Sequence, residues 1–125
     1  MLFRSICYDL RFPEIYQALS KECEVIINIA NWPAKRVDHW NTLLKARAIE
    51  NQAFFVGVNR TGMDGNNIEY QKSSAIYLPN GDLIKGKSIN EEIDLYDIDI
   101  DLVSSYRSSF PVKNDRQIEF YKNVL

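Results

Sequence analysis

The stretch that decides the fold is residues 5–14, Ser-Ile-Cys-Tyr-Asp-Leu-Arg-Phe-Pro-Glu, which carries Cys7 near its start. A short apolar segment, residues 2–6, comes directly before Cys7 and predicts a strand. Pro13 favours the first turn of a helix, where the N–H that proline lacks would have no partner. The stretch therefore predicts a strand, a sharp turn and a helix, an arrangement that can hold a nucleophile beside backbone N–H groups.

Residue type alone leaves two interpretations of Cys7 open. Free cysteine is among the most buried residue types, and an inert cysteine in the core is the simpler interpretation. A catalytic cysteine needs surroundings that favour the thiolate, because the thiolate is the nucleophile. The rest of the sequence has to decide between the two.

A second strand follows the first helix. Residues 24–30 are mostly apolar, with Glu24 and Asn28 as the polar members, and such a run is typical of a strand with both faces covered. With residues 2–6 and a helix over residues 13–22, this run predicts a strand–helix–strand unit whose two strands lie parallel in one sheet. The helix is expected to turn one apolar stripe toward the core, made of Ile15, Ala18 and Leu19.

A second amphipathic helix is expected to begin near Asp38, a residue type that can cap it. Side chains repeat at helical spacing along one face, namely Trp40, Leu43, Leu44, Arg47 and Ala48. The position of Arg47 on this face has two interpretations. Either its stem packs while its guanidinium reaches water, or the guanidinium forms a partly buried ion pair with a carboxylate such as Glu50.

The second half of the chain predicts a third strand and a hairpin. Residues 53–59 are the third apolar segment. Asn80-Gly81 lies between two alternating segments, residues 74–78 and 82–85, and Asn-Gly in such a position is a strong hairpin signal.

An edge strand and a short helix are expected to follow. Residues 92–102 alternate apolar and acidic residues with one slip in phase near Tyr96, which predicts a β-bulge and a solvated acidic face. Asp101 or Ser104 is expected to cap a short helix after it.

Composition excludes several classes of function. A chain of 125 residues is one domain's worth, and its net charge of −2 provides no field for nucleic acid or an anionic membrane. No apolar run approaches the roughly 20 residues that span a bilayer. The single histidine and two separated cysteines have no zinc spacing, so no metal or other cofactor is expected. We expect Cys7 and Cys23 to stay reduced, as in a cytoplasmic protein.

A series of motifs runs in order along the chain. It begins at residues 6–14 and continues through Asn31-Trp32-Pro33, Arg36, His39-Trp40, residues 46–52, 57–62 and 64–66, Tyr70, Ser74, Pro79 and Gly81. These motifs resemble those of the carbon–nitrogen hydrolases, the nitrilase superfamily, and within it the ω-amidase branch. The resemblance favours the nucleophile interpretation of Cys7.

The resemblance implies a fold and a reaction. The fold class is α/β: half of a nitrilase-type α-β-β-α sandwich, a mixed sheet with a βαβ start and a C-terminal hairpin, with residues 1–125 as the C-terminal portion of the domain. The ω-amidases hydrolyse the side-chain amide of small 2-oxo acid amides. Cys7 would attack the amide and form a thioester, the backbone N–H of Tyr8 would stabilise the oxyanion, and Asn31, Trp32 and Pro33 would border the substrate.

The chain departs from the family pattern in two respects. The family's catalytic glutamate and lysine precede the cysteine, yet the six residues before Cys7 contain neither. The chain alone is therefore expected to be inactive. Lys72 stands where the family usually has glycine, which questions the backbone there. The alternatives are a catalytically silent structural or interaction remnant, a nitrilase, or an N-carbamoyl amide hydrolase.

Polar residues near Cys7 have simpler interpretations than catalysis. Asp9, Arg11 and Glu14 are expected to form structural ion pairs. His39, at a helix start, is expected to be structural or to lie on the substrate side. The family resemblance also implies a homodimer, which would bury the helix that starts at Pro13 and the tail after Phe110.

Overall fold

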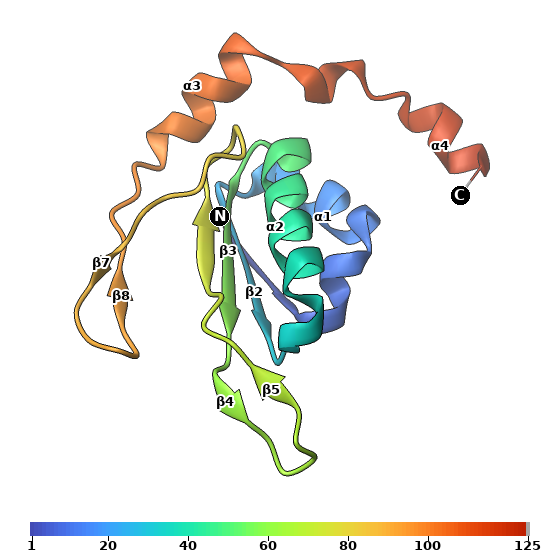
Figure 1. The fold of residues 1–125 in the computed structure, drawn as a ribbon. Helices are drawn as coiled ribbons and strands as arrows, with labels where there is room; N and C mark the ends of the chain where they lie inside the picture. Colours follow the sequence, from blue (N-terminus) through green and yellow to red (C-terminus); the bar gives the residue numbers. More distant parts are fainter. Residues whose placement is uncertain (125) are drawn as a thin grey trace.

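The computed structural model describes residues 1–124 and has one four-stranded sheet at its centre, ordered β1-β2-β3-β6 (Figure 1). The strands are β1 (Leu2–Ile6), β2 (Val25–Ala30), β3 (Phe54–Asn59) and β6 (Ala75–Tyr77). β1, β2 and β3 are parallel, and β6 pairs antiparallel with β3. The predicted mixed α/β sheet with a βαβ start is confirmed.

Two helices cover one face of this sheet, α1 (Pro13–Leu19) and α2 (Val37–Asn51) (Figure 1). Short 3-10 turns join them to the strands: η1 (Cys7–Arg11), η2 (Ser20–Glu22) and η3 (Ala34–Arg36). Arg36 occupies the N-cap of α2 without a side-chain hydrogen bond, so Asp38 lies inside the helix and the predicted cap is wrong.

The main core lies between the sheet and the two helices. Trp40, Leu44 and Phe55 are fully buried in it. Gly57 of β3 is required for the close approach of α2, because a Cβ there would lie 2.4 Å from Leu44 Cδ1. This contact fixes how closely α2 packs on the sheet.

The buried face of α1 differs from the predicted one. Ile15, Ala18 and Leu19 are exposed, while Tyr16 is buried and its hydroxyl donates to Ser5 Oγ (2.8 Å). Tyr16 anchors the helix to β1 through this bond, since a buried hydroxyl needs a partner. The predicted apolar stripe is therefore wrong, and its members lie on the outer surface.

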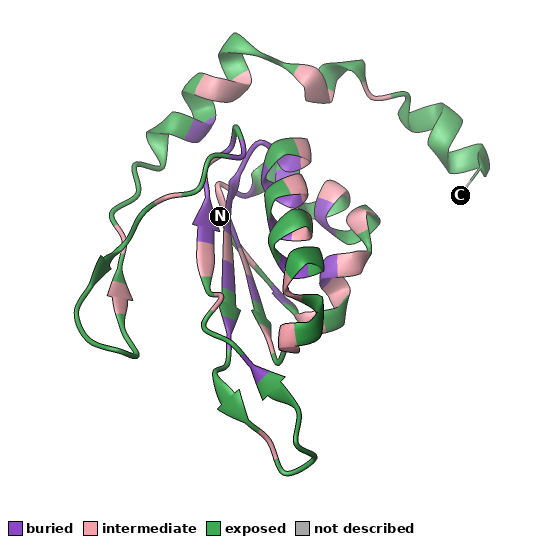
Figure 2. Ribbon diagram, viewed as in Figure 1, coloured by how far each residue is buried: buried purple, intermediate pink, exposed green. Residues whose placement is uncertain are grey.

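The opposite face of the sheet is only partly covered. Phe54, Ile76 and Val103 form a small cluster at one end, while Ile6, Ile29 and Val58 are exposed. Figure 2 shows exposed stretches within the central strands. The prediction that the second strand is covered on both faces is therefore only half right.

Two small hairpins extend from the sheet (Figure 1). One pairs β4 (Gly62–Met63) with β5 (Glu69–Tyr70), and the other pairs β7 (Lys87–Ser88) with β8 (Asp94–Leu95). The predicted edge strand over residues 92–102 is wrong: only Asp94–Leu95 is strand, and a helix begins at Asp101. Apolar–acidic alternation predicted extended structure, but a strand forms only where a partner strand is present.

The predicted turn at Asn80-Gly81 is present, although the segment after it makes only one isolated bridge, Tyr77 to Leu83. Gly81 has φ +88° there, a conformation that favours glycine. Lys72 does not need such a conformation, since its φ is not positive. The backbone at this position therefore accommodates lysine.

The C-terminal arm, residues 101–124, arches over the end of the sheet where β2 and β3 begin (Figure 1). It consists of α3 (Asp101–Ser109), η4 (Val112–Asp115) and α4 (Ile118–Val124). Asp101 starts α3 as its first helical residue, so neither Asp101 nor Ser104 is the cap; the N-cap is Ile100.

Candidate functional site

Cys7 lies directly after β1, at the first residue of η1. It is a partly exposed free thiol with φ +43°, in the left-handed region that non-glycine residues rarely occupy. Residues in such strained conformations persist only where the surrounding structure holds them, and they cluster at active sites. The backbone therefore turns at Cys7 and carries the thiol out of the sheet.

The turn after Cys7 is held by two side chains. The carboxylate of Asp9 accepts the backbone N–H of Ile6 (2.9 Å), which closes the bend on itself. Arg47 reaches across from α2 and donates twice to the carbonyl oxygen of Leu10, from Nε (3.1 Å) and Nη2 (2.9 Å). The N–H of Tyr8 lies in the first turn of η1, where a helix has no internal acceptor for it. The Tyr8 side chain is 65% exposed.

Arg47 also resolves the two interpretations left open by the sequence. Its Nη1 lies 3.1 Å from Glu50 Oε1, so the guanidinium forms the partly buried ion pair. Burial raises the pKa of Glu50, while Arg47 opposes that shift. The remaining Arg47 N–H groups bind Leu10 and so connect α2 to the cysteine turn.

A hollow opens beside Cys7 at the carboxyl ends of β1, β2 and β3. This is the edge where α/β proteins commonly bind ligands. Its lining residues come from the three parallel strands and the loops that follow them: Ile6, Cys7, Ile29, Ala30, Asn31, Val58, Asn59 and Arg60.

The predicted substrate loop lies partly in this hollow. Asn31 is exposed and lines it, whereas Trp32 is buried behind it and Pro33 is half-buried. Trp32 packs against Trp40, with ring centroids 5.4 Å apart, and its indole N–H donates to the carbonyl of Arg36 (2.7 Å). Of the three predicted residues, the structure brings Asn31 together with Cys7 and gives Trp32 a supporting position.

Asn59, at the end of β3, holds this loop and was not singled out from the sequence. Its Oδ1 accepts the backbone N–H of Trp32 (2.7 Å), and its Nδ2 donates to the Trp32 carbonyl (2.9 Å) and to Ser73 Oγ (3.0 Å). A polar residue that ends an otherwise apolar strand could have indicated this role.

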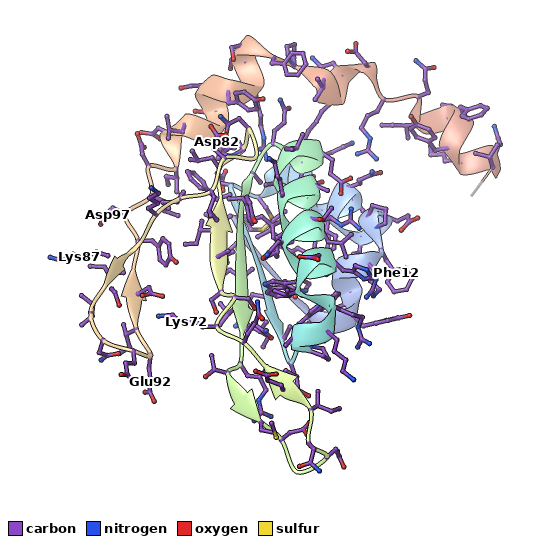
Figure 3. All side chains as sticks on the ribbon, viewed as in Figure 1. Phe12, Lys72, Asp82, Lys87, Glu92 and Asp97 are labelled. Atoms are coloured by element: carbon purple, nitrogen blue, oxygen red, sulfur yellow. The ribbon has the colours of Figure 1, made fainter. Side chains whose placement is uncertain are left out.

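The predicted ion pairs near Cys7 are absent from the described residues. Asp9 binds the Ile6 N–H instead. Arg11 lies over the Trp32 ring, 4.8 Å from its centroid, and its Nη2 approaches His39 Nδ1 (3.5 Å). His39 thus contacts Arg11, which covers the Trp32 ring, and it does not line the hollow. In Figure 3, the neighbouring Phe12 points away from the sheet on the outer side of the helices.

Residues 1–124 contain neither a candidate metal site nor a candidate membrane-spanning helix. No group of three or more His, Cys, Asp or Glu side chains is placed to hold a metal ion. No helix in that part of the chain is long and apolar enough to cross a membrane.

The comparisons with known proteins agree with this arrangement. Residues 2–108 match the carbon–nitrogen hydrolase family, and the chain belongs to this family, the nitrilase superfamily. Relatives named as ω-amidases or 2-oxoglutaramate amidases are about 40% identical to it. A 2-oxoglutaramate amidase of Paenarthrobacter nicotinovorans is 43% identical over 118 residues, which cover 94% of this chain and 40% of that protein. The omega-amidase YafV of Escherichia coli K12 is 39% identical over 112 residues, covering 88% and 43%.

Solved structures give the same result for the fold. The NitFhit protein of C. elegans superimposes with a TM-score of 0.86 at 31% identity, covering 96% of this chain and 30% of that chain. A CN-hydrolase superfamily protein of Xanthomonas campestris gives a TM-score of 0.75 at 32% identity, covering 91% and 46%. The chain therefore spans less than half the length of these relatives, and it matches part of the nitrilase fold.

Proposed function

We propose that this chain is the nucleophile-bearing portion of an amidase that hydrolyses the side-chain amide of a small 2-oxo acid amide. The observation that carries the proposal is Cys7, a partly exposed thiol held in a left-handed turn at the carboxyl end of a parallel sheet. The ω-amidase and 2-oxoglutaramate amidase relatives support this substrate class.

The reaction would proceed through a thioester. The Cys7 thiolate adds to the amide carbonyl, and the N–H of Tyr8 donates to the oxyanion. The amide nitrogen takes up a proton and leaves as ammonia, so the acyl group remains on Sγ. Water then hydrolyses the thioester and releases the acid and the thiol. Asn31 would contact the bound substrate, with Trp32 and Pro33 fixing its loop.

The proton transfers are assigned to groups outside this chain. In the family a glutamate and a lysine that precede the cysteine act as base and oxyanion donor, and residues 1–6 contain neither. Groups that act as one unit fail together when one is missing. We therefore expect the 125-residue chain to release no more ammonia from a 2-oxo acid amide than its Cys7→Ala variant does.

An activated ester tests the nucleophile without those groups. p-Nitrophenolate leaves without being protonated, so p-nitrophenyl acetate requires only the thiolate and the oxyanion donors. The thiolate adds to the ester carbonyl, p-nitrophenolate departs, and an acetyl thioester remains on Sγ. We expect one acetyl group per chain, located on the Cys7 peptide by mass spectrometry.

Two variants provide the controls. Cys7→Ala should abolish the acetyl adduct, and Cys23→Ala should leave it unchanged, because Cys23 is buried and burial raises its pKa. Acetylation of the wild-type chain no faster than that of Cys7→Ala would support the alternative, a catalytically silent interaction remnant.

The proposal includes an assembly and a compartment. Exposed apolar side chains on α1 and on the C-terminal arm, such as Leu19 and Phe120, support a homodimer that buries both elements. Cys7 and Cys23 are free thiols, as expected for a cytoplasmic enzyme with a reduced nucleophile.

A further inference from the structure

The hollow beside Cys7 contains a guanidinium group that the proposed reaction does not use. Arg60 follows β3 directly, and its backbone N–H donates to the carbonyl of Ala30 (3.1 Å). This hydrogen bond fixes the backbone of Arg60 beside Ala30, the last residue of β2. Arg60 lines the same hollow as Cys7.

The side chain of Arg60 is held on an aromatic ring. Its Cζ lies 4.7 Å from the centroid of Tyr70, which is buried and whose hydroxyl donates to Asp64 Oδ2 (2.9 Å). The pKa of Tyr70 is raised, first by this bond to Asp64 and then by burial. The Tyr70 ring therefore contacts Arg60 and is itself fixed by Asp64.

The positive charge of Arg60 is not paired within the described chain. Among residues 1–124, no carboxylate lies within ion-pair distance of its guanidinium. Asp64, the acid whose charge acts on it, is already occupied: Oδ1 accepts the N–H groups of Asn66 (2.8 Å) and Ile68 (3.0 Å), and Oδ2 binds Tyr70.

The neighbouring cation Lys72, by contrast, is paired. It lies 3.0 Å from Asp94 in the β7–β8 hairpin, and Figure 3 shows it directed away from the sheet toward that hairpin. Arg60 is thus the cation that the hollow presents to a ligand.

The spacing of Cys7 and Arg60 follows from the sheet. They directly follow β1 and β3, two strands apart, which separates their backbones by about 10 Å. Between them Ile6, Ile29 and Val58 stand in register across the three strands and form an apolar floor. A ligand that reaches both ends needs an amide at Cys7, a short aliphatic middle, and an anion at Arg60.

We propose that Arg60 is a specificity-determining residue that binds the carboxylate of the substrate, so that the site selects the ω-amide of a small dicarboxylic acid over a neutral amide. The inference rests on the proposed role of Cys7 as nucleophile. It adds the group that would recognise the far end of the substrate.

Two alkylating reagents test this without any amidase turnover. Iodoacetate and iodoacetamide have similar size and the same chemistry: the thiolate displaces iodide and a thioether forms. They differ in charge, so the ratio of their rates at Cys7 reports the local field. We expect Arg60→Gln to lower the iodoacetate-to-iodoacetamide ratio by about three- to tenfold, and Arg60→Lys to retain most of it.

Arg36→Gln is the matched control, because Arg36 is exposed and does not line the hollow. It should leave the ratio unchanged. The ratio in the wild-type chain should fall as salt is added, and the ratio in Arg60→Gln should respond much less.

The outcomes separate the two proposals. Normal alkylation by iodoacetamide with the same ratio in wild type and Arg60→Gln overturns the role of Arg60 and leaves the nucleophile in place. An equal fall in the ratio for Arg36→Gln also overturns it. A Cys7 that reacts with neither reagent while the chain is folded overturns both proposals.

Discussion

At the scale of the residue, Cys7 occupies a conformation that its own side chain disfavours. A left-handed backbone costs a non-glycine residue about 1–3 kcal/mol, which the surrounding hydrogen bonds must offset. Here the Asp9 carboxylate accepts the backbone N–H of Ile6, and the Arg47 guanidinium donates to the carbonyl of Leu10. These bonds hold the bend on either side of Cys7. The thiol is therefore placed by its neighbours in the chain and by α2.

This strain leads to a prediction about stability. Cys7→Gly should be more stable to urea than Cys7→Ala, because glycine adopts φ +43° at little cost. After the larger entropy of glycine in the unfolded chain is subtracted, we expect a difference of about 0.5–1 kcal/mol. At Tyr8, where φ is not positive, glycine should be less stable than alanine. The same order at both positions would contradict a strained turn.

Asn59 leads to a second prediction at this scale. In Asn59→Asp an oxygen would replace the Nδ2 that lies 2.9 Å from the Trp32 carbonyl, so two acceptors would face each other in a buried place. We expect a loss of about 2–3 kcal/mol in the free energy of unfolding, measured in urea. Asn41→Asp on the exposed surface of α2 should change it by less than about 0.5 kcal/mol. A similar, small effect of both substitutions would show that the loop is held by other contacts.

At the scale of the element, strands and helices followed from the sequence where apolar periodicity was strong. β1, β2 and β3 lie within a residue of the apolar segments that predicted them. The buried face of α1 did not follow, because periodicity counts apolar residues and does not detect a hydroxyl bond such as that of Tyr16 to Ser5. A short helix takes its orientation from such a tertiary bond.

In the candidate site, too, some residues could be predicted from the sequence and others could not. Cys7 and Asn31 were found from the sequence because a strand–turn–helix pattern marked Cys7 and the family resemblance assigned both residues to the site, and the structure places them at one edge of the sheet. Asn59 ends the third strand and Arg60 follows it, and the alignment of this strand with the first depends on sheet register. Register is a tertiary property, and one sequence does not specify which polar residues it brings together.

At the scale of the whole molecule, three cations attach the C-terminal arm to the core. Arg107 donates to the carbonyls of Cys23 (2.8 Å), Gln52 (3.0 Å) and two other residues, and Arg116 donates to Gln17. Lys113 Nζ donates to the carbonyl (3.0 Å) and the hydroxyl (3.1 Å) of Ser20. These acceptors lie at the ends of helices, where carbonyls lack internal partners and cations are favoured.

Lys113 makes this attachment depend on pH. Burial, together with the charges of Arg107 and Arg116, lowers its pKa from 10.5 to about 8. Between pH 8 and 10.5 the unfolded chain binds more protons at Lys113 than the folded chain does. The contribution of Lys113 to the free energy of unfolding therefore rises with pH over this range. Below pH 8 the charged amine is held at a cost in the folded state.

The variant Lys113→Met isolates this effect. The free energy of unfolding of the variant minus that of the wild type should decrease between pH 7.5 and 9.5, as measured in urea. Burial also raises the pKa of Cys23, which has the opposite sign of effect on stability. Cys23 is present in both proteins, and its negative charge only opposes the lowering of the Lys113 pKa, which burial dominates. A difference that stays constant or grows over this range would contradict the assignment to Lys113.

The exposed apolar surface of the arm bears on assembly. α4 turns Phe120 (60% exposed) and Val124 outward, and a groove of about 820 Å³ separates this helix from α1. Aromatic and aliphatic side chains that flank a groove are typical of a surface that another chain covers. The open face of the sheet, with Ile29, is a second apolar surface on the same molecule.

The proposed homodimer places its interface at the first of these surfaces, and two matched variants separate them. We expect the wild-type chain to sediment as a dimer at about 20 μM, a concentration suited to micromolar affinity. Phe120→Glu should shift it to monomer, because a charge would be buried without a partner in the interface. Ile29→Glu introduces the same charge on the open sheet face and should leave the dimer intact. A wild-type monomer at this concentration would refute the dimer, and dissociation by Ile29→Glu alone would move its interface to the open sheet face.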